Sequence, residues 1–178
     1  MGCDIHLYVE SKPKNCDKWF TTGFGGEFSE RNYTMFGKLA GVRDEPDYET
    51  FIEPRGVPED ISWCALDGYT LHVVEDDKYE EDSYYQDAEG YCKRSEAEMW
   101  VKNGYSKYWN DDKLLVSGPD WHSASWLTFE EYEKIINTLN SDALGYNRQY
   151  PDYVALLEYM RVFHNCGHDV RIVFWFDN

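Results

Sequence analysis

The chain has little positive charge and no long apolar run. Its 17 lysines and arginines face 34 aspartates and glutamates, so its formal net charge is −17 over 178 residues. A surface of this sign repels phosphate, and we expect no direct binding to a nucleic-acid backbone. No stretch approaches the roughly 18 apolar residues of a membrane span, and the start of the chain lacks the basic and apolar regions of a signal peptide. We therefore expect a cytoplasmic protein that binds no membrane.

Cysteine and glycine motifs with a known chemistry are also lacking. The five cysteines are an odd number, and none of them forms a Cys-x-x-Cys motif. A structural zinc cluster and a disulfide framework are therefore disfavoured. The glycine-rich residues 22–26 match neither a P-loop nor a dinucleotide-binding fingerprint, so we interpret them as a turn or lid.

Much of the acidity lies in one segment. Between residues 75 and 98 there are ten acidic residues and three basic ones. Such a run is usually a solvated excursion, and we place one at about 67–112. The alternative is an acidic surface that mimics DNA and inhibits a host protein.

Apolar patterning predicts an α+β fold in a single domain over residues 1–178. Residues 3–10 alternate between apolar and polar side chains, as in a half-buried strand. Residues 170–176 are apolar on both faces, as in a central strand. We expect a mixed or antiparallel sheet that contains both terminal strands, with helices packed on one side. A homo-oligomer is left open.

Apolar spacing and capping motifs predict where helices lie. Helical spacing of apolar residues predicts helices near 33–40 and from 151 onward. A capping box of Thr128 and Glu131 predicts a third helix, with residues 120–125 as its entry loop. A second box, Ser95 with Glu98, predicts a short helix.

Asp4 and His6 are the most informative residues, because alternation places them on the same polar face of the first strand. Imidazole and carboxylate are ordinary metal ligands and an ordinary acid–base pair. If the 120–125 loop folds over this face, the candidate ligands of a divalent zinc, manganese or magnesium ion are Asp4, His6, His122 and Asp177. The candidate catalytic residues are Asp4, His6 and His122. The simpler alternative is that His122 caps a helix and the other two make ordinary hydrogen bonds.

Three arginines are conspicuous in so acidic a chain. Arg31, Arg43 and Arg55 lie near glycine or proline, and a guanidinium group suits bidentate capture of phosphate or carboxylate. With Asn32 and Ser123 they are the candidate ligand-binding residues. Surface ion pairing is the alternative for the arginines.

Six short motifs support a resemblance to a known family. They are MGCDIH (residues 1–6), RNY (31–33), AGVR (40–43), PRGVPED (54–60), HSASWLT (122–128) and FDN (176–178). With these, and with a poorly matched middle, the chain resembles a family of uncharacterised small proteins of tailed bacteriophages and prophages. The resemblance implies a phage or prophage source and hence the cytoplasm of a bacterial host. It implies no mechanism.

These observations together predict a phage-type accessory protein with a small anionic ligand. We expect it to bind a phosphorylated or nucleotide ligand, such as a host immune signal, and to act as a metal-dependent hydrolase or phosphoesterase. Two alternatives stay open: a non-catalytic nucleotide sponge with the same pocket, and the acidic DNA mimic.

Overall fold

The computed structural model describes residues 2–28, 31–43, 52–141 and 150–177. They form an α+β structure with two compact units. The first unit contains Met1–Ala65 and His122–Asn178, and the second contains Leu66–Trp121. The segment in which we predicted an acidic excursion therefore belongs to the second unit.

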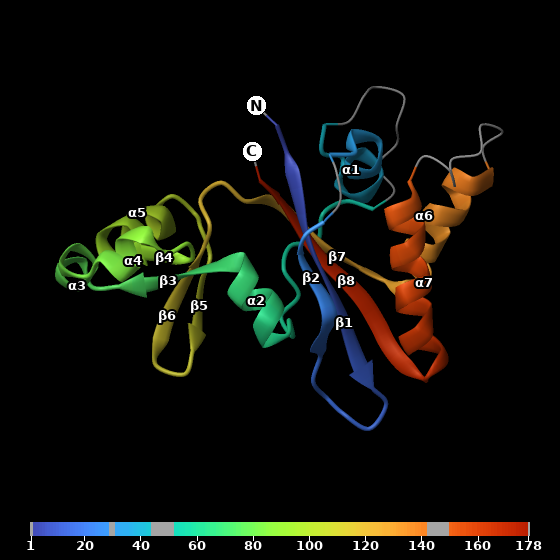
Figure 1. Cartoon of the computed structure of the whole chain (residues 1–178), viewed down its shortest axis with the longest axis horizontal. Coiled ribbons are helices and arrows are strands. Elements are labelled where there is room, and N and C mark those ends of the chain that lie inside the picture. Colours follow the sequence, from blue (N-terminus) through green and yellow to red (C-terminus); the bar gives the residue numbers. More distant parts are fainter. Residues whose placement is uncertain (1, 29–30, 44–51, 142–149, 178) are drawn as a thin grey trace. The chain divides into compact units, whose positions relative to one another are not determined.

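The first unit is built on one antiparallel sheet with the strand order β2-β1-β8-β7. Its strands are β1 (Asp4–Pro13), β2 (Phe20–Glu27), β7 (His122–Thr128) and β8 (His168–Asp177). β1 and β8 pair along their whole length, from Asp4 opposite Asp177 to Pro13 opposite His168 (Figure 1). The prediction that both terminal strands lie in one sheet is confirmed.

Three helices cover one face of this sheet: α1 (Tyr33–Ala40), α6 (Phe129–Ser141) and α7 (Pro151–Asn165) (Figure 1). Alternate strand residues point into the core against them, among them Ile5 and Leu7 of β1 and Phe174 and Phe176 of β8. The predicted helices near 33–40, after Thr128 and from 151 are confirmed. None of the helices in the described ranges is long and apolar enough to cross a membrane.

Local hydrogen bonds fix where α1 and α6 begin. Asn32 Oδ1 accepts the Met35 N–H at 3.1 Å and caps α1. At α6 the predicted capping box is present: Thr128 Oγ1 accepts the Glu131 N–H at 3.3 Å, and Glu131 Oε2 accepts the Thr128 N–H at 3.0 Å. The first four N–H groups of a helix lack helical partners, so these contacts stabilise both starts.

Two segments that we predicted to be loops belong largely to strands in the structure. Residues 22–26 lie within β2, where Gly25 faces Tyr8 so closely that an added Cβ would lie 2.3 Å from its ring. Most of the predicted entry loop at 120–125 belongs to β7, which pairs with β8. The pairing register shifts between His122 and Ser125, and Ser123 has a left-handed φ of 51°. This bulge interrupts the alternation by which a strand is recognised in a sequence.

The second unit has its own mixed sheet with the strand order β4-β3-β6-β5. The strands are β3 (Thr70–Val74), β4 (Tyr91–Lys93), β5 (Lys107–Asn110) and β6 (Lys113–Ser117), and the helices are α3 (Asp76–Glu81), α4 (Ser83–Asp87) and α5 (Arg94–Lys102). The remaining helix, α2 (Trp63–Tyr69), runs across the boundary between the units. The predicted short helix is present as α5, but the predicted box of Ser95 and Glu98 is wrong, because Glu96 accepts the Lys93 N–H and the N-cap is Lys93, two residues before Ser95.

Candidate functional site

The paired ends of β1 and β8 bring three of the predicted site residues together. Asp4 lies opposite Asp177, and His6 lies opposite Trp175. Directly opposite residues of an antiparallel pair share a face, so Asp4, His6 and Asp177 lie on the face away from the three helices. The sequence prediction that Asp4 and His6 share the polar face of the first strand holds in the structure.

His6 is held by a carboxylate and an aromatic ring. Its Nε2 atom lies 2.9 Å from Asp177 Oδ2, and its ring stacks on Trp175 with 5.7 Å between centroids. The other oxygen of Asp177 accepts the Asp4 N–H at 3.1 Å. The side chains of His6 and Asp177 are 24% and 30% exposed, so solvent reaches the pair. When Nε2 carries the proton it donates to Asp177, and Nδ1 becomes the basic nitrogen.

Arg31 binds Asp4 through two parallel hydrogen bonds. Nε donates to Oδ1 and Nη2 donates to Oδ2, each at 2.7 Å. These bonds from Arg31 lower the pKa of the Asp4 carboxyl. The guanidinium group lies directly against Gly2, where an added Cβ would be 1.8 Å from Nη1. The glycine in the MGCDIH motif therefore leaves the space that Arg31 occupies.

Arg43 approaches the same end of β1 from the other end of α1. Burial raises the pKa of the Cys3 thiol, and the nearby Arg43 guanidinium group lowers it only in part. Two residues after α1 have left-handed backbone conformations, Gly41 with φ 66° and Arg43 with φ 56°. An arginine thus lies beyond each end of α1: Arg31 binds Asp4, the first residue of β1, and Arg43 adjoins Cys3, the residue before it.

The charged groups of this site are of both signs. The carboxylates are Asp4, Asp177 and the exposed Glu27, which lies opposite His6 on β2. Arg31 and Arg43 supply two guanidinium groups at the same end of β1, in a chain whose net charge is −17. The two guanidinium groups offset part of the negative charge, so a small anion meets less repulsion here than over a surface of carboxylates alone.

His122 is not brought to this site. It lies opposite Phe176 and stacks on that ring at 6.0 Å, whereas His6 lies opposite Trp175, the neighbouring residue of β8. Successive residues of a strand face opposite sides, so His122 and His6 are on opposite faces of the sheet. His122 Nδ1 contacts Ser123 Oγ at 3.1 Å, and its buried Nε2 has no hydrogen-bond partner among the described residues.

The four predicted metal ligands are therefore not assembled as one group. Asp4, His6 and Asp177 lie together, and His122 is separated from them by the sheet. Within the described ranges there is no group of three or more histidine, cysteine, aspartate or glutamate side chains that could hold a metal ion.

Arg55, Asn32 and Ser123 have structural partners. Arg55 donates to both carboxylate oxygens of Glu131, at 2.9 and 2.5 Å, and lies over the Trp126 ring at 4.6 Å. The bond from Arg55 lowers the pKa of Glu131. Arg55 therefore holds the 54–60 segment to the start of α6. Asn32 caps α1, and Ser123 contacts His122.

A buried charged network was missed by the sequence reasoning. Arg171 is 4% exposed and Glu10 is fully buried; they lie opposite each other, with Arg171 Nε 2.6 Å from Glu10 Oε2. Glu10 also accepts the Ser62 N–H, and Arg171 donates to Asp60 at 2.7 Å. Burial would raise the pKa of Asp60, but hydrogen bonds from Arg171 and Trp19 lower it. The sequence feature that could have indicated this network is Arg171 itself, a single arginine within the apolar residues 170–176.

The chain matches no model of a known protein family, no curated protein and no solved structure.

Proposed function

We propose that the first unit binds a small phosphorylated ligand at the paired ends of β1 and β8, and that His6 with Asp177 transfers a proton during its hydrolysis. The observation that supports this is the 2.9 Å contact between His6 Nε2 and Asp177 Oδ2. A carboxylate on one ring nitrogen fixes the tautomer and stabilises the imidazolium that forms at proton transfer. The phage or prophage source is part of the same proposal and rests on the motifs alone.

The chemistry follows from the positions of the charged groups. His6 Nδ1 would accept the proton of an attacking water and return it to the leaving group. Arg31 uses Nε and one Nη2 hydrogen for Asp4, so its remaining N–H groups are available to phosphoryl oxygens. Fixed guanidinium groups stabilise the charge that develops on those oxygens in the transition state.

A divalent zinc, manganese or magnesium ion remains a prediction for this site. It rests on residue type, because carboxylates and imidazoles are ligands that such ions accept. As they stand, the side chains of Asp4, His6 and Asp177 do not form a group that could hold a metal ion. A metal would compete with the bonds from Arg31 to Asp4 and from His6 to Asp177. The proton transfer itself requires only His6 and Asp177.

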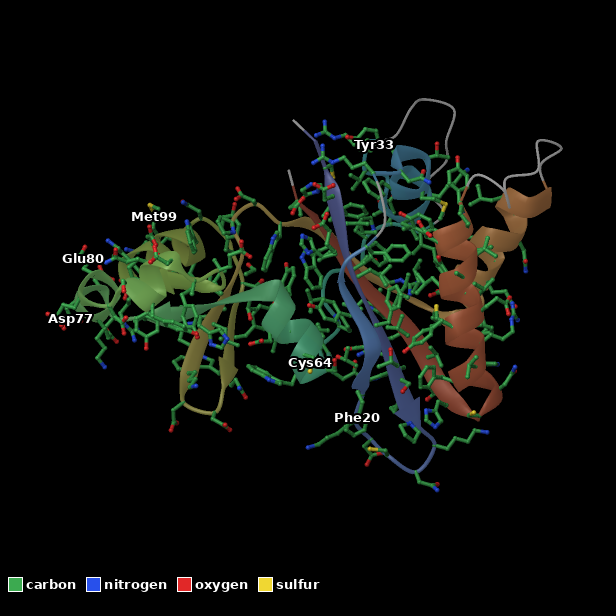
Figure 2. All side chains as sticks on the ribbon, in the orientation of Figure 1. Phe20, Tyr33, Cys64, Asp77, Glu80 and Met99 are labelled. Carbon is green, nitrogen blue, oxygen red and sulfur yellow. The ribbon has the colours of Figure 1, made fainter. Side chains whose placement is uncertain are left out.

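The acidic DNA mimic has less support from the second unit. Glu75 pairs with Arg94 at 2.7 Å, and Asp76 accepts the Ser95 N–H at 3.0 Å. Glu80, which projects from α3 with Asp77 (Figure 2), pairs with Lys93 at 2.8 Å. Several acidic side chains of the 75–98 run therefore stabilise the fold of their own unit.

The test is a turnover assay with linear and cyclic nucleotides and simple phosphomonoesters, with added divalent metal and with chelator. Wild type should convert at least one compound, and His6→Gln should lower its rate on the order of 10²–10⁴-fold, the usual contribution of a general acid or base. His164→Gln, a histidine on α7, is the matched control and should keep the wild-type rate. Recovery of every compound unchanged would contradict hydrolysis, and tight retention of one of them would favour the sponge.

A further inference from the structure

Two adjoining cavities lie in the second unit around Trp109. One has a volume of about 430 Å³ and the other of about 360 Å³, and Arg94, Trp109 and Leu114 line both. Every residue that lines them belongs to Leu66–Trp121. Cavities of this size are typical of small-molecule sites.

Basic side chains gather at these cavities although the unit is acidic. Residues 66–121 contain fourteen acidic and six basic residues. Five of the six basic residues line the cavities: Lys78, Arg94, Lys102, Lys107 and Lys113. The acidic residues of the lining are only Glu75, Glu98 and Asp112. The lining of the cavities therefore contains more basic than acidic residues, although the unit as a whole has a negative net charge.

Most of these cations are available to a ligand. Arg94 is paired with Glu75 at 2.7 Å. None of the four lysines forms an ion pair with a residue that the structure describes. Lys78 and Lys113 line the larger cavity, and Lys102 and Lys107 line the smaller one. Two ammonium groups beside a cavity are suited to an anion with several oxygens.

The larger cavity also has an aromatic wall. The rings of Tyr84, Tyr85 and Tyr91 contact one another at centroid distances of 5.2 to 5.9 Å, and His72 lies 5.4 Å from Tyr91. Tyr84 is 60% exposed and Trp109 is 63% exposed. Exposed aromatic faces beside cations are the groups on which proteins stack nucleic-acid bases.

We propose that these cavities bind a small ligand of the nucleotide class, a planar aromatic base that carries phosphate. A purely apolar ligand would not use the lysines, and an inorganic anion would not use the rings. A long nucleic acid would meet the surrounding acidic surface, so the ligand is a small molecule. This site uses no residue of the paired-termini site, and it stands whether or not His6 and Asp177 act on a phosphorylated ligand.

The experiment is isothermal titration of the full chain with adenosine 5′-monophosphate, with adenosine and inorganic phosphate as partial probes. The nucleotide should bind saturably and more tightly than either partial probe. Tyr84→Ala should weaken its binding about 5- to 150-fold, which corresponds to the loss of one base stack. Lys78→Ala combined with Lys113→Ala should weaken it at least about tenfold, the effect of roughly one charge-assisted hydrogen bond.

The matched controls lie in the first unit and belong to neither proposed site. Phe20→Ala removes an exposed ring there, and Lys18→Ala removes an exposed lysine. Both variants should bind the nucleotide like wild type. Absence of nucleotide binding, equal binding of phosphate and nucleotide, or unchanged binding by Tyr84→Ala and the double lysine variant would each overturn the proposal.

Discussion

His6 and Asp177 are the residues on which the proposed chemistry depends. Asp177→Asn keeps the size of the side chain but removes the charge that stabilises the imidazolium. We expect it to lower turnover of the identified substrate on the order of 10²–10⁴-fold, with a smaller change in KM, because the interaction strengthens in the transition state. Steady-state kinetics measure this. Asp169→Asn, which removes a carboxylate of β8 that pairs with Lys12, is the control and should leave kcat unchanged. Equal kcat values for both variants would rule out a catalytic role for Asp177.

The residues of this site could be predicted in part from the sequence. Alternation placed Asp4 and His6 on one face, and the pairing of the terminal strands brought Asp177 to them. The position of His122 could not be predicted, because the bulge at Ser123 decides which face the histidine takes. The prediction thus grouped three residues that the structure brings together and placed the fourth on the wrong side of the sheet.

At the scale of the element, the start of α6 depends on Glu131, which binds both Arg55 and the Thr128 N–H. The pKa of Glu131 in the folded protein is below its usual value of 4.5, so this carboxylate stabilises the fold above that pH and the contribution is lost as the pH falls through the folded pKa. Glu131→Gln should therefore lower the unfolding free energy by about 0.5–1 kcal/mol at pH 7 and by less near pH 3. Chemical denaturation at both pH values measures this.

The matched control for this pH dependence is Glu130→Gln at the neighbouring position of the same helix. Among the described residues, the ion pair of Glu130 is with His164, at 3.8 Å. We expect Glu130→Gln to lower the unfolding free energy at pH 7 by less than Glu131→Gln does. If Glu131→Gln loses the same amount of unfolding free energy, relative to wild type, at pH 7 and at pH 3, the charge of the Arg55 contact contributes nothing to stability.

The pairing of β1 with β8 contains the buried contact between Glu10 and Arg171. Arg171→Met leaves a buried carboxylate without its partner, so we expect a loss of about 3–5 kcal/mol in unfolding free energy. Arg161→Met, which breaks a half-buried pair with Glu133, should cost only about 0–1 kcal/mol. Adding Glu10→Gln to Arg171→Met should recover part of the loss. Equal costs for the two arginine variants would contradict a structural role for the buried pair.

This contact also illustrates why element positions are easier to predict than element pairing. Residues 3–10 and 170–176 each have a pattern that identifies a strand, and Thr128 with Glu131 identifies the start of a helix. The contact between Glu10 and Arg171 joins residues 161 positions apart and exists only in one register of the two strands. No local pattern specifies that register.

At the scale of the whole molecule, the two units differ in the size of their cores. The core of the first unit includes most of the buried apolar residues of both terminal strands, whereas the cluster in the second unit has three fully buried members, Cys92, Ala97 and Val116. Local stability follows buried apolar packing, so amide hydrogens of β3 and β4 should exchange at least about tenfold faster than those of β1 and β8. Hydrogen exchange followed by mass spectrometry measures this. Uniform protection across the chain would contradict a difference in stability between the units.

Binding of an anion beside His6 is tested most directly by nuclear magnetic resonance of the ¹⁵N-labelled full chain during titration with inorganic phosphate. The imidazole nitrogens of His6 and the Nε–H of Arg31 should shift saturably, with one common dissociation constant. The corresponding groups of His164 and Arg161 should shift little. Absence of any shift at His6 and Arg31, or equal and non-saturating shifts at all histidines and arginines, would contradict an anion site at the paired termini.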